Sequence, residues 1–223
     1  MAKGRQMSKL MWLSSCLTFL AAIIIILAFS TPYWLIADGR QPGEQRFERL
    51  GLWEACFHSF HDVYYRYDIE FKGCRWIFDE EYNIIIEILE PPFFIAVQVF
   101  FTFGFIALLL ACALLLALQI CFPSEKEVLA MKLLSLLMLI AGICCTIALI
   151  TFGARGDGRD WMPDPDHNYL SWSFGLGVVG AFLEYVVSVL FLVESRLAKK
   201  RLAIREQQNY NLEQNQNKMG TVI

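Results

Sequence analysis

Four residues in one polar stretch have side chains that can do chemistry: Cys56, His58, His61 and Cys74. The two thiols can pair as a disulfide, remain free, or join the histidines as metal ligands. The histidine spacing gives no closed ligand set for zinc, so the metal interpretation is the weakest of the three. The choice between the others depends on which side of a membrane the stretch occupies.

A single carboxylate, Glu184, lies inside a long apolar run. Exposing it to lipid would cost at least ~2.5–3.5 kcal/mol, so we expect it to face other helices. Its expected partners are Thr102, Ser135 or Thr146, unless the carboxyl group is protonated. A transport role is the alternative, but no second charge inside an apolar run completes a relay.

Residues 175–180 read G-L-G-V-V-G and match the dinucleotide-binding fingerprint. They lie inside an apolar run without a strand–helix–strand unit, so we interpret the small residues as helix-packing positions. The sequence shows no nucleophile–base pair and no phosphate loop. We therefore expect no enzyme activity, no cofactor and no metal, and a net charge of −3 argues against a nucleic-acid partner.

Composition shows which elements position these residues. The chain has 223 residues, of which 57% are hydrophobic and 18% charged, too apolar for a soluble domain of this length. Its apolar residues gather in four runs long enough to span a bilayer. The predicted division is 1–9 cytoplasmic tail, 10–30 first span, 31–91 outer loop, 92–121 second span, 122–127 inner loop, 128–152 third span, 153–170 outer loop, 171–194 fourth span and 195–223 cytoplasmic tail.

A cleaved signal peptide is the alternative for the first span, but its apolar stretch of ~20 residues exceeds the ~7–15 of a signal core. Basic residues at both tails place the two termini in the cytoplasm. Residues 31–91 hold six basic and twelve acidic residues and 153–170 hold two and four, so both outer loops are acidic. Cys56 and Cys74 then lie in the oxidising compartment, which favours a disulfide.

The large outer loop is predicted to be a small antiparallel sheet. Its strand candidates, rich in aromatic and β-branched residues, are Thr31–Ala37, Phe47–Phe57, Val63–Phe71 and Cys74–Phe78. Turn residues such as Lys72-Gly73 separate them. The segment Asp79–Leu89 has helical spacing of apolar residues and is predicted to be a short amphipathic helix.

Trp34, the triplet Gly51-Leu52-Trp53, and Cys56 with Cys74 form a W…GLW…C…C pattern in the first outer loop. In a four-span chain this pattern resembles the claudin superfamily, which includes epithelial membrane proteins, peripheral myelin protein and calcium-channel γ subunits. The resemblance implies a membrane α-helical fold, a left-handed four-helix transmembrane bundle with a small extracellular antiparallel β-sheet. Residues 168–175 are similar to the invertebrate septate-junction, Pasiflora-type branch.

In that superfamily these motif residues are structural. The Trp34 and Trp53 rings suit the membrane interface, and Gly51 permits close backbone approach. The sequence departs from the family in two ways: more residues separate the cysteines than in the tight motif, and 79–92 contain no Arg. Contacts between subunits known for vertebrate claudins are therefore not transferred.

The resemblance implies a plasma-membrane protein of lateral cell–cell junctions that contributes to septate-junction assembly, adhesion and the paracellular barrier. Its partners would be membrane lipids and itself or other claudin-like proteins, both in one membrane and across to the next cell. The alternative is an auxiliary regulatory subunit of an ion channel or receptor.

The cytoplasmic segments carry further candidates. Cys121 is either a palmitoylation site or a small residue at a helix end. Residues 196–205 are basic and should form a helix at the inner leaflet, whereas the Gln/Asn-rich residues 207–217 are expected to be disordered. The ending Thr221-Val222-Ile223 fits recognition by a PDZ scaffold.

Overall fold

The computed structural model describes residues 8–39, 46–61, 70–120, 127–156, 158, 161–163 and 165–220. Cys121 and Thr221–Ile223 lie outside this range, as does most of the predicted strand Val63–Phe71.

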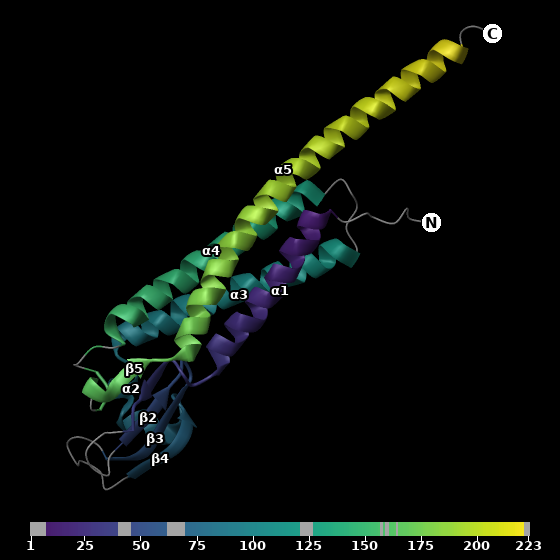
Figure 1. Ribbon diagram of the computed structural model, residues 1–223. Helices are drawn as coiled ribbons and strands as arrows, with labels where there is room; N and C mark the ends of the chain where they lie inside the picture. The colour runs from purple at the N-terminus through teal and green to yellow at the C-terminus, as the bar shows by residue number, and fades with distance from the viewer. Residues whose placement is uncertain are drawn as a thin grey trace.

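Four long helices form the body of the molecule: α1 (Lys9–Ser30), α3 (Pro92–Ile120), α4 (Glu127–Arg155) and α5 (Trp172–Gly220). Each is long and apolar enough to cross a membrane. They pack as a ring in which α1 contacts α3, α3 contacts α4, α4 contacts α5 and α5 contacts α1. Figure 1 shows the sheet at one end of this bundle and the start of α1 and the end of α5 at the other.

The outer surface of the bundle is apolar. Large aliphatic and aromatic side chains on every helix are solvent-exposed in the isolated chain, among them Ile23, Phe103, Leu110, Ile150 and Phe182. Exposing this apolar surface to water would cost free energy, whereas the acyl chains of a lipid bilayer solvate it without that cost. The predicted four-helix membrane fold is confirmed.

Small residues let the helices approach closely. A Cβ on Gly104 of α3 would lie 2.6 Å from Cys145 Sγ on α4, and one on Gly180 of α5 would collide with Ile25 of α1. A Cβ on Gly177 would lie 3.0 Å from Leu149 Cδ2. Two glycines of the dinucleotide-like fingerprint therefore serve helix packing.

Among the described residues, five strands make one antiparallel sheet in the order β4-β3-β2-β1-β5. Their bounds are β1 Leu35–Ala37, β2 Arg46–Leu50, β3 Glu54–His61, β4 Glu70–Trp76 and β5 Asn168–Leu170. The strand predicted over 47–57 was wrong as a single element, because the chain turns back at residues 51–53. The turn predicted at Lys72-Gly73 was also wrong: Gly73 lies within β4, where it adopts a positive φ of 80°.

The predicted amphipathic helix over 79–89 is two shorter elements. Asp79 caps the 3₁₀-helix η1 (Glu80–Ile84) by accepting a hydrogen bond from the Glu81 amide, and α2 (Ile86–Leu89) follows. Of the four apolar residues at helical spacing, Tyr82, Ile85 and Leu89 are buried as predicted, and Ile86 is half-buried. A second 3₁₀-helix, η3 (Pro165–His167), leads directly into β5.

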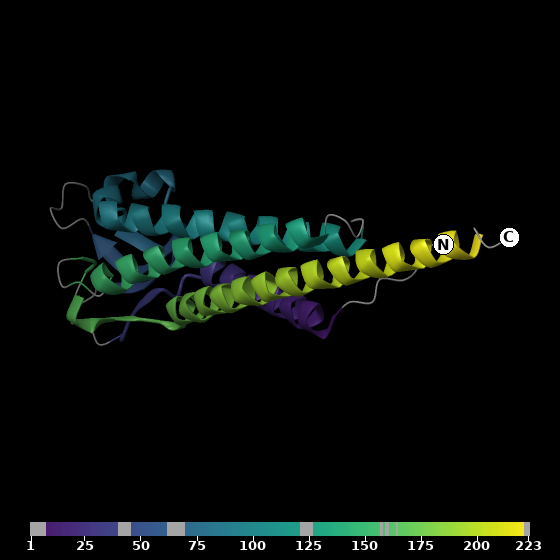
Figure 2. The same ribbon diagram turned by 90° about the horizontal axis from the view of Figure 1, so that it is seen from above.

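The last helix continues far beyond the bundle. Residues 207–217, expected to be disordered, are helical, and α5 runs on to Gly220. Gln, Glu, Leu and Lys favour helices, and neither Pro nor Gly interrupts the segment before Gly220. Gln214 also donates a hydrogen bond to the Tyr210 hydroxyl one turn earlier, at 2.8 Å. Figure 2 shows this part of α5 extending past the other helices.

Candidate functional site

The disulfide lies at the centre of the longest hairpin. Cys56 on β3 and Cys74 on β4 are directly opposed in the strand register and are bridged, as predicted. Both sulfurs are therefore consumed and cannot act as thiolate metal ligands. The His58 imidazole instead lies 3.6 Å from the Glu48 carboxylate. The bond fixes the register of two strands whose connection is long.

Trp34 lies inside the protein, not at the lipid interface where its amphipathic ring was expected. Its side chain is fully buried, and Nε1 donates to the Ala28 carbonyl at 2.7 Å. The rings of Phe101, Phe152 and Phe174 meet it edge-on at 5.1, 5.1 and 5.9 Å. The chain folds back over the bundle immediately after α1, so this ring joins the sheet to all four helices.

The Gly-Leu-Trp triplet attaches the β2–β3 turn to the bundle. A Cβ on Gly51 would lie 2.6 Å from Pro32 Cα and 2.8 Å from the Thr31 carbonyl oxygen, so a larger residue would collide with backbone. Leu52 is fully buried, and its carbonyl accepts a 2.8 Å hydrogen bond from Gln98 Nε2 on α3. Gly51 therefore lets the turn approach the backbone that follows α1, and Leu52 then fixes the turn to α3.

Trp53 is half-buried at the boundary between sheet and bundle. Its ring lies 5.3 Å from Phe29 of α1 and 6.4 Å from Phe78. Phe78 and its neighbour Trp76 are 47% and 59% exposed. Within the described residues, these two side chains occupy the place next to the lipid-facing helices that suits a membrane-interface aromatic.

The second outer loop joins the same sheet. In the β1–β5 register Leu35 opposes Leu170 and Ala37 opposes Asn168, and the Asp38 amide donates to the His167 carbonyl at 2.9 Å. The His167 ring lies 3.1 Å from the Asp38 carboxylate. Sequence reasoning missed this strand because three residues are too few for a period-2 pattern.

Tyr82 locks η1 against the sheet. Its hydroxyl donates to the Ala55 carbonyl at 3.1 Å, and its buried ring meets Phe57 and Phe71. Burial raises the pKa of Tyr82 to about 12, so the hydroxyl stays a neutral donor at physiological pH. The following helix, α2, is held in a similar way, because Trp161 Nε1 donates to the Ile88 carbonyl at 2.8 Å.

Glu184 faces the bundle interior as predicted, but its predicted partners were wrong. The hydroxyls of Thr102, Ser135 and Thr146 are hydrogen-bonded to Gln98, Ser188 and Tyr185 instead. The Glu184 side chain is fully buried, and within the described chain neither carboxylate oxygen has a nitrogen or oxygen donor as a hydrogen-bond partner. It lies beside the Cys145 thiol.

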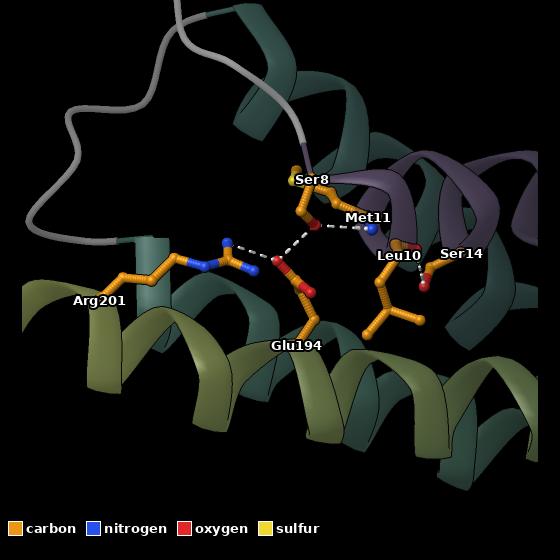
Figure 3. A network of polar contacts seen from close by, with 6 residues as sticks. All are labelled: Ser8, Leu10, Met11, Ser14, Glu194 and Arg201. Carbon is orange, nitrogen blue, oxygen red and sulfur yellow. Dashed lines mark hydrogen bonds and ion pairs between the residues drawn. The ribbon is translucent and has the colours of Figure 1, made fainter.

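A second buried carboxylate, Glu194, stands at the last position of the predicted fourth span, and its burial was not predicted. Ser8 Oγ donates to its Oε1 at 2.7 Å, and Arg201 donates to the same oxygen at 3.1 Å. Ser8 Oγ also accepts from the Met11 amide and so caps α1. Figure 3 shows the carboxylate between the serine and the arginine. The network joins α1 to α5 at the end opposite the sheet.

Four lipid-facing helices, with a disulfide-bonded sheet built from both loops at one end, define a tetraspan membrane protein that presents a rigid surface beyond the bilayer. The chain belongs to the family described as PMP-22/EMP/MP20/claudin tight junction, whose sequence model matches residues 19–193. No curated protein matches the chain. Family membership indicates a structural, junction-type protein rather than an enzyme.

Proposed function

We propose that this protein contributes to septate-junction assembly, cell adhesion and the paracellular barrier, with its sheet outside the cell and both termini in the cytoplasm. The observation that carries the proposal is the β1–β5 pairing. It makes one rigid unit from two loops that are separated by two membrane spans. A pre-organised surface loses little conformational entropy on association, which favours assembly with neighbours.

The two ends of the sheet are the surfaces that support assembly. β4 and β5 are the edge strands of the described sheet, and edge strands present unpaired backbone groups that can pair with another chain. Exposed aromatic side chains accompany each edge, namely Trp76 on β4 and Tyr169 on β5. Aromatic residues are enriched in interfaces between proteins. We infer that copies or relatives of this chain associate through these edges.

The test places full-length, internally tagged protein in an epithelial layer. The proposal predicts enrichment at lateral cell contacts and increased tracer leakage after depletion. Replacing Tyr169 with Ser should reduce enrichment, whereas Tyr210→Ser, an exposed change on the distant part of α5, should not. Uniform membrane distribution with normal tracer exclusion would contradict the proposal. Co-purification with a pore-forming subunit would then identify the auxiliary-subunit alternative.

We also propose that Thr221-Val222-Ile223 binds a PDZ scaffold, with the terminal carboxylate held by backbone amides. Deleting these three residues should abolish capture by an immobilised PDZ domain of matching class. Equal capture of full-length and truncated protein would contradict this. Palmitoylation of Cys121 is tested in the same material by hydroxylamine-sensitive labelling, which Cys121→Ser should remove.

A further inference from the structure

A groove of about 320 Å³ lies where the sheet overhangs the beginning of α3. It is lined by Trp53, Phe78, Glu90, Ile95, Gln98, Val99, Thr102 and Phe103. The lining thus combines one face of a membrane span with aromatic side chains of the large outer loop. None of these lining residues is basic.

The floor of the groove faces lipid. Ile95, Val99 and Phe103 follow each other at one-turn spacing along α3 and are 43%, 45% and 59% exposed. They belong to a helix whose length and hydropathy fit a membrane span. Trp53 and Phe78 cover this face from the sheet side. Because its floor is lipid-facing, the natural occupant of the groove is a membrane lipid rather than a soluble ligand.

The polar end of the groove discriminates between lipids. Glu90 accepts a 3.3 Å hydrogen bond from Gln98, whose amide is also held by the Leu52 carbonyl. Trp53 Nε1 is buried and has no hydrogen-bond partner among the described residues. The lining residues therefore supply a carboxylate acceptor and an unused N–H donor, a combination that suits a hydroxyl, which both donates and accepts. The same carboxylate repels a phosphate headgroup.

We propose that this groove binds a sterol in the leaflet next to the sheet. The sterol hydroxyl donates to Glu90 and accepts from the Trp53 indole after a small adjustment of that ring. The rigid, flat ring system packs on Val99 and Phe103, below the overhang of Phe78. A rigid apolar body loses less conformational entropy on ordering than two flexible acyl chains do, which favours a sterol further.

The test uses the purified full-length protein in phosphatidylcholine vesicles that contain a diazirine-bearing cholesterol analogue. Adducts mapped by mass spectrometry should concentrate on residues 95–103 and be removed by excess cholesterol. Val99→Trp should fill the groove and reduce labelling at least about tenfold. Leu110→Trp, a lipid-facing change on the same helix about 16 Å away, should leave labelling unchanged. Glu90→Gln should weaken labelling severalfold while keeping the side-chain shape.

Three results would overturn the proposal. One is labelling spread evenly over the lipid-facing surfaces of all four helices. Another is labelling that Val99→Trp does not reduce. The third is competition by diacylglycerol as effective as that by cholesterol, which would identify a general acyl-chain groove. Circular dichroism of each variant separates loss of binding from loss of folding.

Discussion

Ser8 and Glu194 lie 186 positions apart in the sequence, yet Ser8 Oγ donates a 2.7 Å hydrogen bond to the Glu194 carboxylate. The same serine oxygen caps α1 by accepting from the Met11 amide. One side chain therefore begins the first span and fixes it to the last. The sheet fastens the helices at one end of the bundle, and this pair fastens two of them at the other.

Replacing Ser8 with Ala should destabilise the protein by about 1–3 kcal/mol, because the helix cap and a partner of a buried charge are lost together. The measurement is the thermal midpoint in detergent. Ser30→Ala is the control on the same helix, since that exposed hydroxyl bonds only the Ile26 carbonyl. In a double-mutant cycle with Glu194→Met, which removes the acceptor, a coupling below about 0.5 kcal/mol would contradict the described contact.

The two buried glutamates of α5 should respond oppositely to the same change. Glu194→Met removes the partner of Ser8 and Arg201 and should lower the thermal midpoint. Glu184→Met replaces a buried carboxylate that has no nitrogen or oxygen donor as a partner in the described structure, only the weakly donating Cys145 thiol beside it, so it should keep or raise the midpoint. Unfolding of the Glu184 variant would show that its carboxylate has a stabilising role.

Gly51→Ala should prevent normal folding, because the added Cβ collides with the backbone at Pro32 and Thr31. Overpacking of this kind costs about 1–3 kcal/mol or more. We expect retention inside the cell and reduced surface biotinylation. The matched control is Gly175→Ala, where a Cβ meets no atom within 4 Å. Normal surface delivery of Gly51→Ala would contradict the close packing of this turn.

Loss of the Cys56–Cys74 bond should destabilise the outer sheet by about 3 kcal/mol in the chain-entropy model. Cys56→Ser is therefore expected to reduce surface delivery strongly. Cys16→Ser, a change at an exposed free cysteine of α1, is the control and should behave as wild type. If both variants reached the surface equally, the sheet would not depend on its disulfide.

The buried hydroxyl of Tyr82 should make the stability of the protein depend on pH in the alkaline range. Its pKa is about 10 in the unfolded chain and about 12 when folded, so the native state holds this proton more tightly. Its hydroxyl should contribute about 1 kcal/mol below pH 10, a contribution lost as pH rises through 12. The stability difference between wild type and Tyr82→Phe should stay constant to pH 10 and then decline. A difference independent of pH up to 12 would contradict the burial of this hydroxyl.

Features that leave a long or a paired pattern in the sequence could be predicted from it. Apolar runs of span length identified the four helices, and two cysteines on the acidic, outward side identified the disulfide. Features that depend on tertiary contacts were not predictable. An aromatic ring just after a span fits both the lipid interface and a buried core, and only the fold-back after α1 assigns Trp34 to the core.

Short elements, and residues at the boundary between two elements, were not predicted for related reasons. β5 has three residues and forms because β1 is available to pair with it. Glu194 stands at the junction of an apolar run and a basic tail, where a solvated charge is the usual interpretation. Its burial follows from Ser8, far away in sequence. The Gln/Asn-rich tail was judged by composition, although its Gln, Leu and Glu residues favour a helix and no Pro interrupts it.

The central proposal is that this protein contributes to the seal between cells, through the sheet that its two loops form together. The most direct test is paracellular dextran flux across an epithelium depleted of the protein and rescued with either wild type or Gly175→Ala. The account predicts increased flux after depletion and full restoration by both proteins, with the rescuing protein concentrated at cell contacts. Unchanged flux after verified depletion would contradict it.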